Sequence, residues 1–160
     1  MNEILAAIAE AEAKKNYHSD TGTAIGNLQP LLEWFDRETG ETEARFNERW
    51  GGAFVYHCLR LAGYDLPAVY PDPRVGGSFA DPMAWERYAR LPKIHLWRQE
   101  ETPEVGDLVF WMGKREGECF VGILLRSDGE TMELAVGDYH RHSAVVERSV
   151  ALPLRGMVRF

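Results

Sequence analysis

The spacing of apolar residues changes at Pro103, and this change constrains the fold more than any other feature of the chain. Before Pro103, apolar residues recur every three or four positions, which is typical of one-sided helices. After it, short segments rich in β-branched and aromatic residues alternate with turn residues. Helices followed by antiparallel strands predict an α+β domain. No repeat or linker divides the 160 residues, so we predict one domain over 1–160, with a helical part at 1–45 and a core at 46–160.

Local signals place the individual elements. Asn2 can cap a first helix, Pro30 suits the first residue of a second, and Asp81 followed by Pro82 opens a short later one. The longest helical pattern runs from Gly51 to Gly63. Strands are predicted at Asp107–Met112, Cys119–Arg126, Thr131–Val136, Ala144–Val150 and Gly156–Phe160.

Two adjacent glycines, Gly51 and Gly52, begin this longest helix. Glycine costs about 1 kcal/mol relative to alanine inside a helix, so a pair in the first turn needs a reason. The pair predicts either a close approach of another backbone segment or a position that has lost its side chain.

Composition excludes several classes of function. The formal net charge is −7 and no cluster of lysine and arginine occurs, so we expect no nucleic-acid partner. Cys58 and Cys119 lie in apolar runs and are predicted to be reduced. The amino-terminal segment lacks the pattern of a signal peptide or membrane span. The sequence therefore predicts a cytoplasmic protein that binds no membrane, with release by lysis or a secretion machine left open.

Five segments in order resemble the NlpC-type and CHAP-type cysteine amidases and peptidases, a papain-like group of which many members cut bacterial cell-wall peptides. The segments are "RWGGAFVYHCLRLAG", "PEVGDLVFW", "FVGILL", "AVGDYHRHSAVVERSV" and "LRGMVRF", and they extend over about residues 45–160. The resemblance implies a papain-like fold in which amino-terminal helices pack on a carboxy-terminal antiparallel sheet.

The same resemblance assigns three catalytic slots. The family's cysteine opens the helix, where the dipole stabilises its thiolate, a histidine on the sheet is the base, and a polar residue orients that histidine. In this chain the three slots fall on Gly51, Phe120 and Asp138. Because glycine has no nucleophile and phenylalanine carries no proton, the resemblance predicts a catalytically degenerate domain that acts as a binding or regulatory module. We expect no cofactor, a peptide or protein ligand, and a relict cleft formed by Trp50, Gly51, Gly52, Phe120, Asp138 and His140.

Two rival functions stay open. An active cysteine amidase would need a different alignment, or a Gly51 introduced in place of cysteine, although neither Cys58 nor Cys119 occupies the slot. A metal-dependent hydrolase could use Asp138, His140 and His142, which would share one face if the segment "DYHRH" were extended. The oligomeric state and the identity of the ligand do not follow from the sequence.

Overall fold

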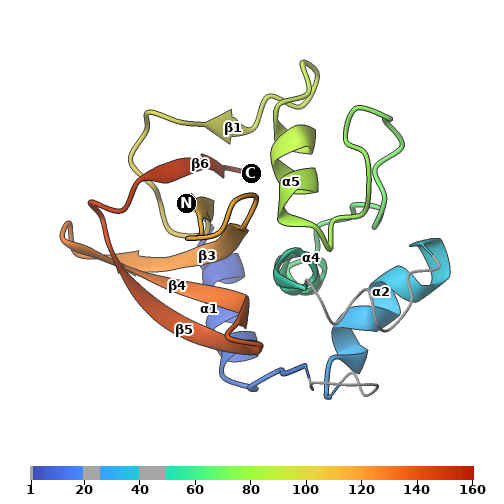
Figure 1. The fold of residues 1–160 in the computed structure, drawn as a ribbon, viewed down its shortest axis with the longest axis horizontal. Coiled ribbons are helices and arrows are strands. Elements are labelled where there is room, and N and C mark those ends of the chain that lie inside the picture. Colours follow the sequence, from blue (N-terminus) through green and yellow to red (C-terminus); the bar gives the residue numbers. More distant parts are fainter. Residues whose placement is uncertain (1, 20–25, 40–49) are drawn as a thin grey trace.

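A computed structural model describes residues 2–19, 26–39 and 50–160 (Figure 1). These ranges form four helices and one six-stranded antiparallel sheet, which confirms the predicted α+β class. The helices are α1 (Glu3–Ala13), α2 (Gln29–Thr39), α4 (Gly51–Leu61) and α5 (Pro82–Ala89). The strands are β1 (Trp97–Arg98), β2 (Leu108–Met112), β3 (Cys119–Ser127), β4 (Thr131–Tyr139), β5 (His142–Ser149) and β6 (Leu154–Val158).

The predicted capping residues begin two of these helices. The Asn2 side chain accepts a hydrogen bond from the Leu5 amide at 3.1 Å. The Asp81 side chain accepts one from the Met83 amide at 2.9 Å, and Pro82 follows it as the first residue of α5. Pro30 is the second residue of α2 rather than the first. Each side-chain bond satisfies an amide that has no partner within its helix.

The strand order in the sheet is β1-β6-β2-β3-β4-β5. Strands β2 to β5 form a meander of neighbouring antiparallel pairs, and β6 pairs with the other edge of β2.

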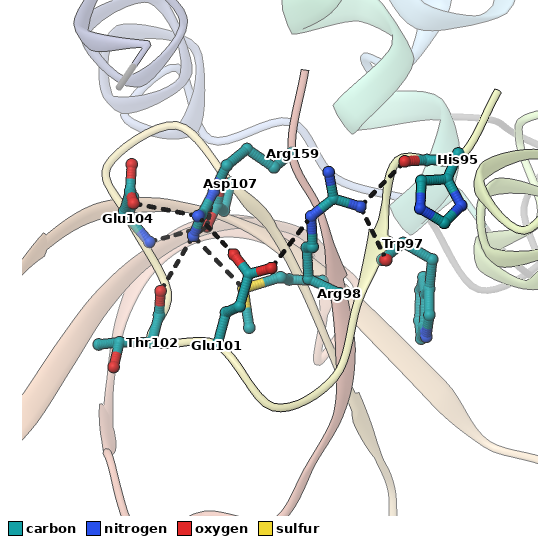
Figure 2. A network of polar contacts seen from close by, with 9 residues as sticks. His95, Trp97, Arg98, Glu101, Thr102, Glu104, Asp107 and Arg159 are labelled. Atoms are coloured by element: carbon teal, nitrogen blue, oxygen red, sulfur yellow. Dashed lines mark hydrogen bonds and ion pairs between the residues drawn. The ribbon is translucent and has the colours of Figure 1, made fainter.

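The sequence did not predict β1, because a strand of two residues is too short to show a periodic pattern. Trp97 pairs with Val158 on β6, and Arg98 forms an ion pair with Glu101 at 3.2 Å (Figure 2).

Helices α1, α4 and α5 pack on one face of the sheet, and α2 packs on α4. Figure 1 shows α4 end-on at the centre, between the sheet, α2 and α5. Residues 52–59 of α4 are all buried, so this helix is covered on every side. The strands contribute alternate residues to this inner core, among them Val121, Ile123 and Leu125 of β3.

The opposite face of the sheet has an apolar cluster of its own, which we call the outer cluster. Its buried members are Val109, Trp111, Leu124, Met132, Leu134, Val136 and Val146, and Phe120, Tyr139, Ala144, Leu152 and Leu154 pack against it. Both faces of the sheet are therefore apolar at its centre. None of the described helices combines the length and apolar character that a membrane crossing needs.

Arg159, just after β6, ties the end of the chain to the loop before β2 (Figure 2). Its guanidinium contacts carboxylate oxygens of Asp107 at 2.8 Å, Glu101 at 2.9 Å and Glu104 at 3.0 Å. It also donates to the Thr102 carbonyl oxygen at 2.9 Å. Asp107 is only 3% exposed, so its carboxylate depends on this cation for compensation of its buried charge.

We predict that Arg159→Met lowers the free energy of unfolding by about 2–4 kcal/mol, because it leaves the buried Asp107 carboxylate without its cation. Arg115→Met removes an arginine from an exposed turn and should change this free energy by less than about 0.5 kcal/mol. Urea denaturation of both variants, fitted with a common m-value, makes the comparison. Equal midpoints for the two variants would contradict the assigned role of Arg159.

Candidate functional site

The amino-terminal end of α4, which we call the α4 mouth, consists of Trp50, Gly51 and Gly52 with Gly137 and Asp138 of β4. Trp50 is the N-cap residue, is fully buried and makes no side-chain capping bond to the helix. Its indole Nε1 is buried and finds no acceptor among the described residues. The Trp50 amide donates to the Asp138 carboxylate at 3.4 Å. A negative charge therefore lies at the positive end of the α4 dipole.

An irregularity in β4 places Asp138 there. The pairing of β4 with β5 shifts register between Val136 and Tyr139, and Asp138 has a left-handed backbone with φ of 50°. An interruption of this kind re-aims a side chain that regular alternation would point elsewhere. Asp138 consequently reaches the α4 mouth although its neighbour Val136 belongs to the outer cluster.

The two glycines that begin α4 differ in their surroundings. A Cβ atom on Gly52 would overlap the Phe79 carbonyl oxygen and lie 2.5 Å from that of Ala80. A Cβ atom on Gly51 would meet the Gly137 carbonyl oxygen at 3.7 Å, an ordinary contact, as its nearest described neighbour. Gly52 thus has the close backbone approach that the sequence offered as one explanation. Gly51, by contrast, has room for a Cβ atom as far as the described residues are concerned.

Gly137 is a further residue of the α4 mouth that the sequence analysis missed. A Cβ atom on Gly137 would overlap Phe54 Cβ and lie 3.2 Å from Trp50 Cζ3. The absence of a side chain therefore lets β4 lie directly against the first turn of α4. An isolated glycine within a strand pattern is a signal of such an approach and could have identified it.

Phe120 lies in a different group of residues. Its ring stacks on Trp111 with centroids 5.7 Å apart and an interplanar angle of 19°. It packs against the outer cluster, whereas the next residue, Val121, is part of the inner core with α4. The described contacts therefore gather Trp50, Gly51 and Asp138 at one end of α4 and leave Phe120 on the other face of the sheet.

Both cysteines are free, as predicted, and neither is poised as a nucleophile. Cys58 is completely buried, and the cost of burying a thiolate raises its pKa well above the ordinary value. Burial likewise raises the pKa of Cys119 to about 11. The neighbour of Cys58, His57, is bonded to Trp34 and Glu12 instead. A reactive cysteine needs a lowered pKa and access to substrate; neither thiol has a lowered pKa, and Cys58 is in addition fully buried.

The segment "DYHRH" forms a tight turn between β4 and β5. His140 and Arg141 have φ values of 51° and 70°, and Tyr139 pairs with His142 across them. Two successive positive φ values are typical of the two-residue type I′ hairpin turn. The segment is therefore not extended, and the alternation assumed for a site of Asp138, His140 and His142 does not hold.

The side chains of the two histidines also point to separate partners. The exposed His140 lies against Tyr139 with ring centroids 4.5 Å apart, and His142 Nδ1 is 3.1 Å from the Asn16 side-chain oxygen. Among the described residues, no three of His, Cys, Asp and Glu are grouped in a way that could hold a metal ion.

Comparisons with protein-family models, with curated proteins and with solved structures find no match to this chain. The α+β architecture is thus established by the structure, and the resemblance to the NlpC and CHAP types stays a prediction from the sequence.

A matched pair of substitutions tests the difference between the two glycines. Gly52→Ala should lower the free energy of unfolding by about 1–3 kcal/mol, because the new methyl group collides with carbonyl oxygens that belong to the backbone. Gly51→Ala should leave it unchanged or raise it by up to about 1 kcal/mol, since alanine is the better helix former. Chemical denaturation measures both, and equal losses would show that Gly51 is as enclosed as Gly52.

Proposed function

We propose that this chain is a papain-like domain of the NlpC or CHAP type that has lost the peptidase machinery and binds a peptide or protein ligand at the α4 mouth. The observation that carries the proposal is the unobstructed position of Gly51 at the start of the central helix. In the resembled family this position carries the catalytic cysteine. A glycine that packing requires would have a structural explanation. Packing does not require Gly51, so the loss of a former cysteine is the better explanation for it.

The chemistry of the α4 mouth favours a neutral acceptor group on the ligand. The first amides of an α-helix have no partner within the helix and can donate to a ligand carbonyl oxygen. The Asp138 carboxylate lies beside the same helix end, so it disfavours a second negative charge. A backbone carbonyl of a peptide satisfies both conditions. We therefore propose a peptide segment rather than a free carboxylate or phosphate as the bound group.

The active-amidase alternative receives less support. It requires a thiolate beside a base, but burial raises the pKa of both Cys58 and Cys119. The metal-hydrolase alternative relied on an extended segment from Asp138 to His142, where the chain makes a hairpin turn instead.

Titration with soluble cell-wall peptides tests the proposed binding. We expect backbone amide shifts at Gly51, Gly52 and Asp138 in ¹H–¹⁵N spectra, and no hydrolysis of the peptide. Gly51→Phe should abolish these shifts by filling the α4 mouth, whereas Gly51→Ala should retain them because a methyl group fits. Shifts confined to other surfaces would contradict binding at this mouth. Turnover lost on replacing Cys58 or Cys119 would instead support an active amidase.

An introduced thiol tests the slot itself. In a background with Cys58→Ala and Cys119→Ala, we expect Gly51→Cys to fold and to be alkylated with an apparent pKa below the reference of about 8.5, because the helix end stabilises its thiolate. Adding Asp138→Asn should lower this pKa further, since it removes a nearby negative charge. Glu116→Cys, on an exposed turn, provides the reference thiol. A Gly51→Cys thiol that resists alkylation would show that Gly51 is not accessible.

Phe120→His, added to Gly51→Cys, examines the histidine slot separately. Phe120 packs on the face of the sheet away from α4, so we expect the pH profile of alkylation to stay that of the single variant. A further lowering of the thiol pKa would instead place both side chains in one cleft.

A further inference from the structure

A chain of buried polar side chains joins three helical segments away from the α4 mouth. Glu12 on α1 and His57 on α4 are 6% exposed, and Trp34 belongs to α2. Trp34 Nε1 donates to His57 Nδ1 at 2.8 Å, and His57 Nε2 lies 3.2 Å from Glu12 Oε2. The Tyr17 hydroxyl donates to the same Glu12 oxygen at 2.7 Å, and Lys15 pairs with the other oxygen at 2.7 Å.

The partner on α2 determines the tautomer of His57. An indole N–H can only donate, so Nδ1 of His57 must present its lone pair to Trp34. The ring proton of the neutral imidazole then lies on Nε2, where it donates to the Glu12 carboxylate. Both ring nitrogens are thus hydrogen-bonded. The bond to Trp34 requires an unprotonated Nδ1, and the bond to Glu12 requires a protonated Nε2.

A second proton on His57 has only Nδ1 to occupy. An Nδ1–H group would face the Trp34 N–H at 2.8 Å, so two donors would oppose each other and the bond between α2 and α4 would be lost. Burial, the largest influence, lowers the pKa of His57, while Glu12 acts in the opposite direction and Lys15 reinforces the lowering. The neutral ring is therefore the form that the folded state selects.

The charged groups around His57 act in both directions, since Glu12 favours a protonated ring and Lys15 opposes it. From the α1 side, His57 is faced by Glu12, Lys15 and the Tyr17 hydroxyl, and on α4 the Cys58 thiol is adjacent. Arg60 lies over the Trp34 ring at 5.2 Å. A protonated His57 would thus place a second cation beside the indole that Arg60 already covers. Among the described contacts, Trp34 is the one residue of α2 that touches the imidazole, and it is neutral.

We propose that His57 is a pH-sensitive latch that bonds α2 to α4 when neutral and, when protonated, releases Trp34 and so loosens α2, whose buried Phe35 still packs on α4. The described side-chain hydrogen bonds of His57 go to Trp34 on α2 and Glu12 on α1, so we expect the effect of protonation to be local to α2. The proposal rests on the Trp34–His57–Glu12 geometry and not on ligand binding at the α4 mouth. Either proposal can fail without the other.

The tautomer is the first test. Long-range ¹H–¹⁵N spectra of the wild-type protein at about pH 8, where histidine is neutral, should show His57 protonated on Nε2 and unprotonated on Nδ1. The Trp34 indole proton should exchange slowly with solvent. The Nδ1–H tautomer, or a rapidly exchanging Trp34 indole, would overturn the latch without any substitution.

The pH dependence of hydrogen exchange is the second test. Because the folded state lowers the pKa of His57, its contribution to stability is complete above the unfolded pKa of about 6.5 and is lost as the pH falls through the folded pKa. Between about pH 8 and pH 5, on either side of that reference value, protection of α2 amides should fall relative to α5 amides after correction for intrinsic exchange.

Trp34→Phe and His95→Asn complete the experiment. Trp34→Phe removes the hydrogen bond that protonation of His57 would break, so α2 protection should already be lower at pH 8 and should no longer fall more than that of α5 as the pH decreases. His95 is exposed, and His95→Asn should leave the wild-type profile unchanged. The latch is wrong if α2 and α5 protection change in parallel in the wild type, or if Trp34→Phe and the wild type give the same profile.

Discussion

Direct backbone contact around the first turn of α4 is the constraint on which the rest of the structure depends. Gly137 lets β4 lie against Phe54, and Gly52 lets the Phe79–Ala80 segment lie against the same turn. No side chain separates Gly52 from the Phe79–Ala80 backbone, and Gly137 lies directly against the side chains of Phe54 and Trp50. Helix α4 is therefore held at the centre and is buried from Gly52 to Leu59. A helix buried on all sides is apolar all round unless each polar group within it has a partner.

Two features of α4 follow from this burial. At its beginning, the exposed end of the dipole is compensated by Asp138 rather than by a capping side chain of its own. Six residues later, about 9 Å along the axis, His57 is enclosed and must be satisfied by α1 and α2. The α4 mouth and the His57 latch therefore both arise because α4 is buried at the centre of the fold. Both depend on how closely the neighbouring elements pack against this helix.

Local sequence patterns were sufficient for the fold class and most elements. The run of apolar residues in β3 and the capping by Asn2 and Asp81 are local signals, so they can be recognised in the sequence directly. The sequence could not supply contacts between distant residues. The bond from Trp34 to His57 spans 23 positions and the one from Trp50 to Asp138 spans 88. The assumption of an extended segment at His140 was also wrong. A positive φ is usually marked by glycine, and neither His140 nor Arg141 gives that signal.

Under the proposed function the α4 mouth is a relict catalytic site, and its contacts give a reason why some of its positions would persist and others would not. Asp138 stabilises the end of a buried helix by accepting from the Trp50 amide, and this contribution needs no catalysis. Gly52 and Gly137 are required by close backbone packing. Among the described residues a Cβ atom at Gly51 meets only the Gly137 carbonyl oxygen, so the loss of a side chain there costs little more than the preference of a helix for a residue other than glycine. If hydrolysis was lost as proposed, position 51 would be free to change while Gly52 and Gly137 stayed fixed by packing.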